Sequence, residues 1–200
     1  MSNPFSVVKQ FEDDLCEYTG APYCVTTTSC TMALLLACYY HRIEEVGIPA
    51  RTYVGVAQSI INAGGRIKFD DRDWTGWYQL SPYPIWDSAR WFSSGMYSRM
   101  KGQMVCLSFH WGKTLGLQQG GAILLDDPEA AAALRKMRFD GRTEGVPCKE
   151  DSFVRGWHAY MSPEIAALGV VKLGLLPAVN MPLPHDDYPD LSQTDWNNFR

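Results

Sequence analysis

Long apolar runs are missing from this sequence of 200 residues. Even the most apolar stretch, residues 32–38, ends at two tyrosines, a histidine and an arginine, so it is too short to cross a bilayer. The N-terminus has no signal-peptide pattern either. We therefore expect a cytoplasmic protein with no membrane partner.

Clusters of one charge are also missing. The chain has 18 basic and 22 acidic residues, a formal net charge of -4, and no run of lysines or arginines. Proteins that bind polyanions usually carry a basic patch or stripe. The sequence therefore gives no reason to expect a nucleic-acid partner.

The sequence also lacks the cysteine and histidine spacings that indicate disulfides or metal sites. The six cysteines include no CxxC pair, and most have apolar neighbours. The four histidines are scattered without the spacing of metal ligands. We expect free thiols that are mostly buried, and neither a disulfide framework nor a metal site.

What is present is the composition of an ordinary globular domain, with 46% hydrophobic and 20% charged residues. Strand patterns alternate with helical patterns along the chain, which favours an α/β fold with a mostly parallel sheet flanked by helices. Strands are predicted at residues 22–26, 45–49, 66–70, 83–86, 103–109 and 121–125. Helices are predicted at residues 4–19, 31–42, 53–62, 127–139 and 162–173, with Thr52 as the cap of the helix at 53–62. An aromatic loop of unknown role is predicted between 71 and 83.

The C-terminal residues differ from the rest of the chain. Beyond Leu176 there are four prolines and few apolar side chains to anchor the segment. We expect residues 1–176 to form the folded domain and residues 177–200 to be an extended tail, either packed on a partner or loose.

Three polar features follow predicted strands, where open α/β sheets place their ligands. The first is the hydroxyl-rich turn at residues 26–31, which leads into a helix. Free backbone N-H groups and the helix dipole at that point, together with the hydroxyls, suit a phosphate. The alternative is simple helix capping by Thr28 or Ser29.

The second feature is Asp87, at the end of an apolar strand. Its carboxylate is placed to stay ionised beside Arg90, or beside the protonated ring nitrogen of a cofactor. The alternative is again a helix cap.

The third feature is Lys113, in a turn after the strand that contains Ser108. Among apolar and aromatic neighbours a lysine loses solvation, which lowers its pKa and frees the amine to attack a carbonyl. The alternative is a solvated surface lysine.

Taken in order, a phosphate turn, an acid after one strand and a lysine after another outline a site for pyridoxal 5'-phosphate. The lysine would hold the aldehyde as a Schiff base, and the acid would keep the pyridine nitrogen protonated. Tyr53, at the start of a predicted helix, is well placed to stack on the ring.

These motifs resemble, in order, those of the DegT/DnrJ sugar aminotransferases. The segments that carry the resemblance are residues 28–34, 51–57, 85–90, 108–122 and 156–167. It implies the large domain of fold type I enzymes, with Lys113 and Asp87 as catalytic residues. It also implies that the cofactor is bound by Lys113, Asp87, Tyr53, Ser29, Cys30, Thr31, Arg90, Ser108 and His110.

The resemblance further implies a function and an assembly. Family members use a donor such as glutamate and a keto nucleotide-sugar acceptor, and they work as homodimers with sites at the subunit interface. We therefore expect an aminotransferase that acts on a keto sugar.

The sequence also departs from the family pattern. Cys30 stands where glycine is usual, Arg90 where glutamine or histidine is common, and His158 and Tyr160 where asparagine and arginine are usual. The length predicts that the C-terminal small domain is absent. Two alternatives therefore stay open: a cofactor-binding or scaffold subunit that needs a partner chain or lacks turnover, and a plain α/β binding domain without cofactor.

Overall fold

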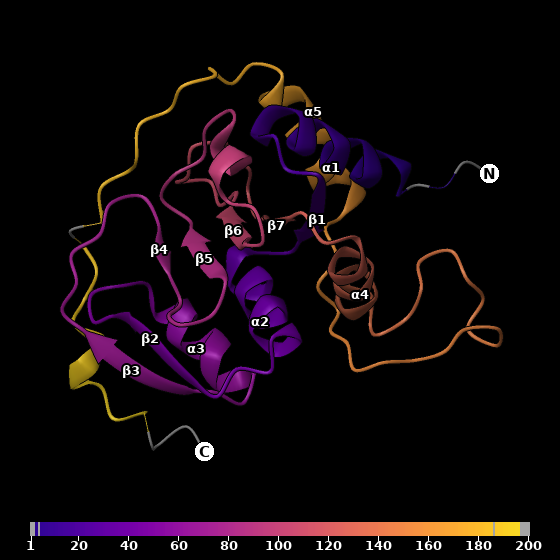
Figure 1. Ribbon diagram of the computed structural model, residues 1–200. Helices are drawn as coiled ribbons and strands as arrows, with labels where there is room; N and C mark the ends of the chain where they lie inside the picture. The colour runs from indigo at the N-terminus through magenta and orange to yellow at the C-terminus, as the bar shows by residue number, and fades with distance from the viewer. Residues whose placement is uncertain (1–2, 4, 186, 197–200) are drawn as a thin grey trace.

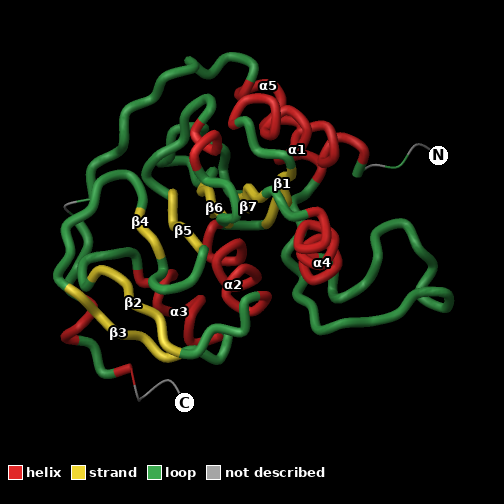
Figure 2. Tube along the Cα trace, in the orientation of Figure 1, coloured by secondary structure: helices red, strands yellow, loops and turns green. Residues whose placement is uncertain are grey.

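The computed structural model describes residues 3, 5–185 and 187–196. The helices are α1 (Ser6–Thr19), α2 (Cys30–Tyr40), α3 (Val54–Asn62), α4 (Pro128–Arg138), α5 (Pro163–Leu173) and the short 3-10 helices η1 (Met96–Arg99) and η2 (Leu191–Gln193). The strands are β1 (Tyr23–Thr27), β2 (Glu45–Pro49), β3 (Arg66–Asp70), β4 (Tyr78–Gln79), β5 (Ile85–Ser88), β6 (Met104–Ser108) and β7 (Gly121–Leu125). Figures 1 and 2 show their arrangement.

Five strands form one sheet in the order β1-β7-β6-β5-β4, and β2 and β3 form a separate parallel pair. Two backbone hydrogen bonds between Gly47 and Ser81, of 2.7 and 3.0 Å, connect that pair to the segment after β4. The α/β fold is confirmed, but the sheet is mixed. In the larger sheet the neighbours β5 and β6 pair in parallel, whereas the pairs β1–β7, β6–β7 and β4–β5 are antiparallel. The reason is local: no helix lies between β6 and β7, so β7 returns antiparallel.

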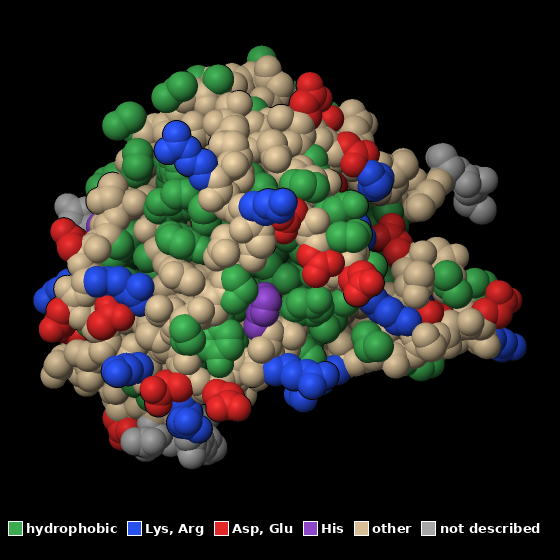
Figure 3. Space-filling model, viewed as in Figure 1, with side chains coloured by type: hydrophobic (Ala, Val, Ile, Leu, Met, Phe, Trp, Pro, Cys, Tyr) green, Lys and Arg blue, Asp and Glu red, His purple; other side chains and the backbone are tan. Residues whose placement is uncertain are grey.

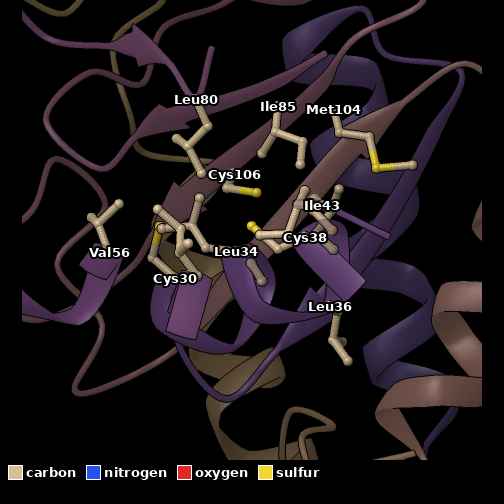
Figure 4. Close-up of a cluster of buried hydrophobic side chains, with 14 of the residues drawn as sticks. Cys30, Leu34, Leu36, Cys38, Ile43, Val56, Leu80, Ile85, Met104 and Cys106 are labelled. Carbon is tan, nitrogen blue, oxygen red and sulfur yellow. The ribbon is translucent and has the colours of Figure 1, made fainter. Parts of the chain in front are cut away.

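Helices cover both faces of the larger sheet. Alternate residues of β6 point to opposite faces, as the pleat requires. Cys106 belongs to a first buried cluster with residues of α2, α3 and α4. Val105 and Leu107 belong to a second buried cluster with residues of α1, α5 and η1. Figure 4 shows part of the first cluster, where Leu34 of α2 lies beneath Cys106. This packing holds the N-terminus of α2 beside the strand ends.

Most helix boundaries follow from local signals in the sequence. Ser29 Oγ accepts a hydrogen bond from the N-H of Met32 (3.1 Å), and Asp127 and Ser162 cap α4 and α5. Gly20 ends α1 in a left-handed conformation with φ 78°. The predicted helix start at Pro4 lies outside the described residues.

Two local predictions were wrong. Thr52 does not cap α3, whose N-cap residue is Tyr53, because the Thr52 hydroxyl is bonded to Tyr78 instead, 2.5 Å away. Tyr78 itself belongs to β4, inside the segment predicted to be a loop. β4 has only two residues, which is too short to give a periodic pattern.

The tail packs on its own chain, which differs from both alternatives expected from the sequence. The Trp91 indole donates to the carbonyl of Asn180 (3.0 Å), the N-H of Leu183 donates to the carbonyl of Arg90 (2.8 Å), and the N-H of Leu191 donates to the carbonyl of Ala50 (2.8 Å). In Figure 1 the tail runs from α5 down past β4 and β3. Within residues 177–185 and 187–196, η2 is the one helix or strand of the tail, in keeping with its prolines.

Charged side chains of both signs are interspersed on the face of the molecule in Figure 3. None of the helices in the described ranges has the length and apolar character of a membrane span. The cysteines are free thiols, and four of the six are buried. Cys148 is exposed, because it lies in the long loop between α4 and α5.

Candidate functional site

The strand directions bring the three polar features to one edge of the sheet. Thr27, at the end of β1, and Ser108, at the end of β6, both pair with Gly121 at the start of β7. Strand β5 runs parallel to β6, so Asp87 lies near the same edge. The carboxyl ends of β1, β5 and β6 therefore surround one space.

That space is a cavity of about 350 Å³, which we call the Lys113 cavity. Its volume falls within the range of small-molecule sites. All nine residues proposed from the sequence line it: Ser29, Cys30, Thr31, Tyr53, Asp87, Arg90, Ser108, His110 and Lys113. The other lining residues are Leu34, Thr52, Val56, Trp74, Ala89, Gly112, Gln119, Gly120 and Tyr188.

Asp87 lines this cavity and is only 5% exposed. Its Oδ1 accepts a hydrogen bond from the N-H of Ala89 (2.9 Å), and its Oδ2 accepts one from the Tyr78 hydroxyl (3.1 Å). The Cys30 thiol lies 3.9 Å from Oδ1. Burial raises the pKa of Asp87, while the bonds from Ala89 and Tyr78 and the charge of Lys113 oppose that rise. The carboxyl group is therefore held in one orientation.

Asp87 does not cap a helix, because β5 is followed by a turn. Nor does it pair with Arg90, whose ion pair is with Asp187 of the tail. Asp87 instead lines the cavity, held by its bonds to Ala89 and Tyr78.

Lys113 is half-buried, and its backbone N-H donates to the carbonyl of His110 (2.8 Å). Burial lowers the pKa of its amine, the nearby charge of Arg90 lowers it further, and Asp87 acts in the opposite direction. A lower pKa leaves more of the amine unprotonated and nucleophilic near neutral pH. Lys113 is thus not a freely solvated surface lysine.

The hydroxyl-rich turn wraps tightly around the start of β7. A Cβ on Gly121 would lie 2.4 Å from the carbonyl carbon of Ser29 and 2.5 Å from the N atom of Cys30. Glycine at this position lets the first turn of α2 reach the edge of the sheet. The Ser29 hydroxyl serves as the helix cap, while Thr31 and Ser108 also face the cavity.

Tyr53 covers the start of α3 and is 52% exposed. Its ring lies against Gly55, where a Cβ would be 2.6 Å from Tyr53 Cε1 and 2.7 Å from the Thr31 hydroxyl. The absence of a side chain at Gly55 therefore lets Tyr53 and Thr31 line the same cavity.

Sequence reasoning missed three aromatic residues of the site. Tyr78 holds Asp87, and Trp74 and Tyr188 line the cavity. Tyr78 and Trp74 lie in the aromatic segment at residues 71–83, for which the sequence suggested no role. The high density of aromatic residues there was the signal that could have indicated a part in the site. Tyr188 gave no signal, because its contact with Arg90 joins residues 98 positions apart. His158 and Tyr160 do not line the cavity.

Comparison with solved structures shows the same fold. The chain superposes on the sugar aminotransferase CalS13 from Micromonospora echinospora with a TM-score of 0.70 and 16% identity over 84% of the chain. It superposes on NtdA from Bacillus subtilis, with bound cofactor PMP, with a TM-score of 0.68 and 20% identity over 85% of the chain. A DegT DnrJ EryC1 StrS aminotransferase from Brucella abortus gives a TM-score of 0.68 and 21% identity over 85% of the chain.

This chain spans only part of those proteins: 60% of CalS13, 48% of NtdA and 58% of the Brucella abortus protein. No curated protein matches it significantly. The DegT/DnrJ/EryC1/StrS aminotransferase family matches residues 2–85 and 85–181, which is most of the sequence. The chain therefore belongs to the DegT/DnrJ/EryC1/StrS aminotransferase family.

Proposed function

We propose that this protein is a pyridoxal 5'-phosphate-dependent aminotransferase that moves an amino group from a donor such as glutamate to a keto sugar. The observation that carries the proposal is that Asp87 and Lys113 share one cavity. One is a buried carboxyl group held by hydrogen bonds, and the other is an amine of lowered pKa.

The residues present fit this cofactor. The Asp87 carboxylate suits a protonated ring nitrogen, and the first turn of α2, with Thr31 and Ser108, offers N-H and hydroxyl groups for a phosphate. Lys113 supplies the amine that binds an aldehyde covalently. Catalytic roles are therefore proposed for Lys113 and Asp87, and cofactor binding for these two and for Tyr53, Ser29, Cys30, Thr31, Arg90, Ser108 and His110.

When bound, pyridoxal phosphate supplies an aldehyde and a ring that accepts electrons. The protein's own part is to hold and move protons around it. Asp87 would keep a proton on the ring nitrogen, and the Lys113 Nζ, once free, would act as the base and acid that moves protons beside the substrate. Tyr53 lines the cavity, where its ring would stack on the ring of the cofactor.

The sugar acceptor is proposed because the chain belongs to the DegT/DnrJ/EryC1/StrS aminotransferase family and its fold superposes on the sugar aminotransferase CalS13. A nucleotide-sugar with a keto group is the acceptor class that we propose. Exposed aromatic side chains beside the cavity, Tyr53 and Trp111, support a homodimer in which a second copy covers them. We place the protein in the cytoplasm.

A second candidate is a subunit that binds the cofactor but needs a partner chain for turnover. It is favoured by the exposure of Tyr53 and Trp111, which leaves aromatic surface for another chain to cover. Both candidates require that Lys113 bind the cofactor, and they differ in what happens when an amino donor is added.

The experiment has two stages. The protein is incubated with pyridoxal phosphate, reduced with borohydride and digested, and the peptide that carries Lys113 should gain the mass of the reduced cofactor. Lys113→Ala should abolish this gain, and Lys101→Ala, which changes an exposed lysine outside the cavity, should not. Absence of the adduct from the Lys113 peptide would exclude both candidates.

In the second stage glutamate is added to the loaded protein. An aminotransferase should lose the yellow absorbance and release 2-oxoglutarate in a single turnover. A protein that only binds the cofactor should keep its colour. The keto-sugar acceptor is then tested by recovery of the colour in its presence.

A further inference from the structure

Two backbone hydrogen bonds attach the tail to the domain, one before and one after Asp187 and Tyr188 in the sequence. On one side the N-H of Leu183 donates to the carbonyl of Arg90, and on the other the N-H of Leu191 donates to the carbonyl of Ala50, each at 2.8 Å. The segment between these two anchors carries Asp187 and Tyr188. Tyr188 lines the Lys113 cavity, where its ring centre lies 6.2 Å from that of Tyr53 and 6.4 Å from that of Trp74.

Among the cavity residues that the tail contacts, Arg90 is the one that carries a charge partner from it. The Arg90 side chain is only 14% exposed, and its Nη2 donates to Oδ1 of Asp187 (3.0 Å). Its Nε donates to the Tyr188 hydroxyl (2.9 Å), and its guanidinium lies 4.7 Å from the centre of the Tyr188 ring. The cation is thus nearly buried beside Lys113, and its ion pair is with an aspartate from the tail.

Asp187 is a poor permanent partner for such a cation. Its side chain is 74% exposed, and an ion pair with so exposed a carboxylate adds little to stability. A carboxylate carried by a ligand inside the cavity can instead bind the guanidinium with two parallel hydrogen bonds. Exchange of one carboxylate for another would leave the charge of the cavity unchanged.

We propose that Arg90 is the binding site for the carboxylate of the amino donor, and that Asp187 occupies this site until the donor displaces it. This inference rests on the proposed function, because every amino-acid donor carries a carboxylate next to its amino group. Beyond the proposed function, the inference makes Arg90 a residue that determines donor specificity. It also makes the Asp187 carboxylate a competitor of the donor carboxylate for Arg90. The two anchors keep the tail attached while Asp187 moves away.

The test uses glutarate, a dicarboxylate with neither a carbonyl nor an amine, so it cannot react with Lys113. Its affinity for the 200-residue protein is measured by calorimetry. Arg90→Gln should weaken binding about tenfold or more, since a hydrogen-bonded charged partner is lost. Asp187→Asn should strengthen binding by roughly two- to fivefold, which is the effect of removing an exposed competing ion pair. The neutral analogue 1,5-pentanediol should not bind.

Hydrogen exchange gives a second measurement that does not depend on affinity. Bound glutarate should speed exchange at the amide of Tyr188, which bonds to the carbonyl of His185 at 3.3 Å. The anchoring amides of Leu183 and Leu191 should stay protected. Inorganic phosphate serves as a competitor, and glutarate binding at Arg90 should persist in its presence.

The inference is overturned if glutarate does not bind, if its affinity is unchanged in Arg90→Gln, or if Asp187→Asn binds it less tightly. It is also overturned if phosphate displaces glutarate completely, which would place the anion at the hydroxyl-rich turn. Asp187 is exposed, so its substitution tests the idea even if Arg90→Gln fails to fold. The proposed function fails separately, through loss of the borohydride adduct on Lys113.

Discussion

The Tyr78 hydroxyl lies 3.1 Å from Oδ2 of Asp87 and 2.5 Å from the hydroxyl of Thr52. These three residues come from β4, β5 and the segment before α3, and all three are buried. Buried polar groups of this kind are costly unless they are paired. The chain of hydrogen bonds therefore fixes the direction of the acid on which the proposed chemistry depends.

The first prediction concerns Tyr78→Phe. Loss of the hydroxyl removes a bond that lowers the pKa of Asp87, so this pKa should rise further above its usual value. The free energy of unfolding should fall by about 1–2 kcal/mol, because Thr52 also loses its partner. A pH titration of the aspartate carboxyl carbons by NMR measures the first effect, and urea unfolding measures the second.

The matched control is Tyr83→Phe. The Tyr83 hydroxyl accepts a hydrogen bond from the N-H of Glu44 (2.8 Å) and does not contact Asp87. Its loss should leave the titration of Asp87 unchanged. If Tyr78→Phe also left that titration unchanged, the positioning role of Tyr78 would be wrong.

The second prediction concerns stability as a function of pH. Burial raises the pKa of Asp87 in the folded protein above its unfolded value. The stabilising contribution of the protonated group is therefore full below the unfolded pKa and is lost as the pH rises through the folded pKa. As the pH rises from the unfolded pKa of Asp87 through its folded pKa, the free energy of unfolding of the wild type should fall relative to that of Asp87→Asn. Urea unfolding of both proteins at a series of pH values gives the difference, and a difference that stays constant would contradict the raised pKa.

The third prediction concerns the amine of Lys113. Burial lowers its pKa, Arg90 lowers it further, and Asp187 raises it. Arg90→Gln should therefore slow labelling of Lys113 by an amine reagent at mildly alkaline pH, and Asp187→Asn should speed it. Mass spectrometry measures the labelling, with exposed Lys101 as the internal reference. Changes of the same sign in the two variants would show that charge does not control this amine.

The fourth prediction concerns the packing of the turn against the sheet. Gly121→Ala should lower the free energy of unfolding by about 1–3 kcal/mol, because its Cβ would lie 2.4 Å from backbone atoms of Ser29 that cannot move freely. Gly112→Ala is the control, since its Cβ would come no closer than 3.8 Å to the atoms around it. Thermal and urea unfolding should therefore separate the two variants clearly. Equal stability would contradict the close approach of α2 and β7.

Much of the site follows from the sequence. Strands β2 and β3 have the predicted bounds, and Ser29, Asp127 and Ser162 cap the predicted helices. These features depend on interactions within a few residues, such as a side chain that caps the next turn. The hydroxyl-rich turn, Asp87 and Lys113 could also be predicted to share a cavity, because each of them follows the end of a strand.

The tertiary structure alone decided the rest. The direction of β7, the bond from Tyr78 to Asp87 and the contact of the tail with Arg90 join segments that are not neighbours in a regular pattern. Such contacts depend on how the chain returns across the sheet, and no local propensity encodes that path. The sequence thus predicted which polar residues line the cavity, while folding determined which groups surround Asp87 and Arg90 and so hold their side chains in place.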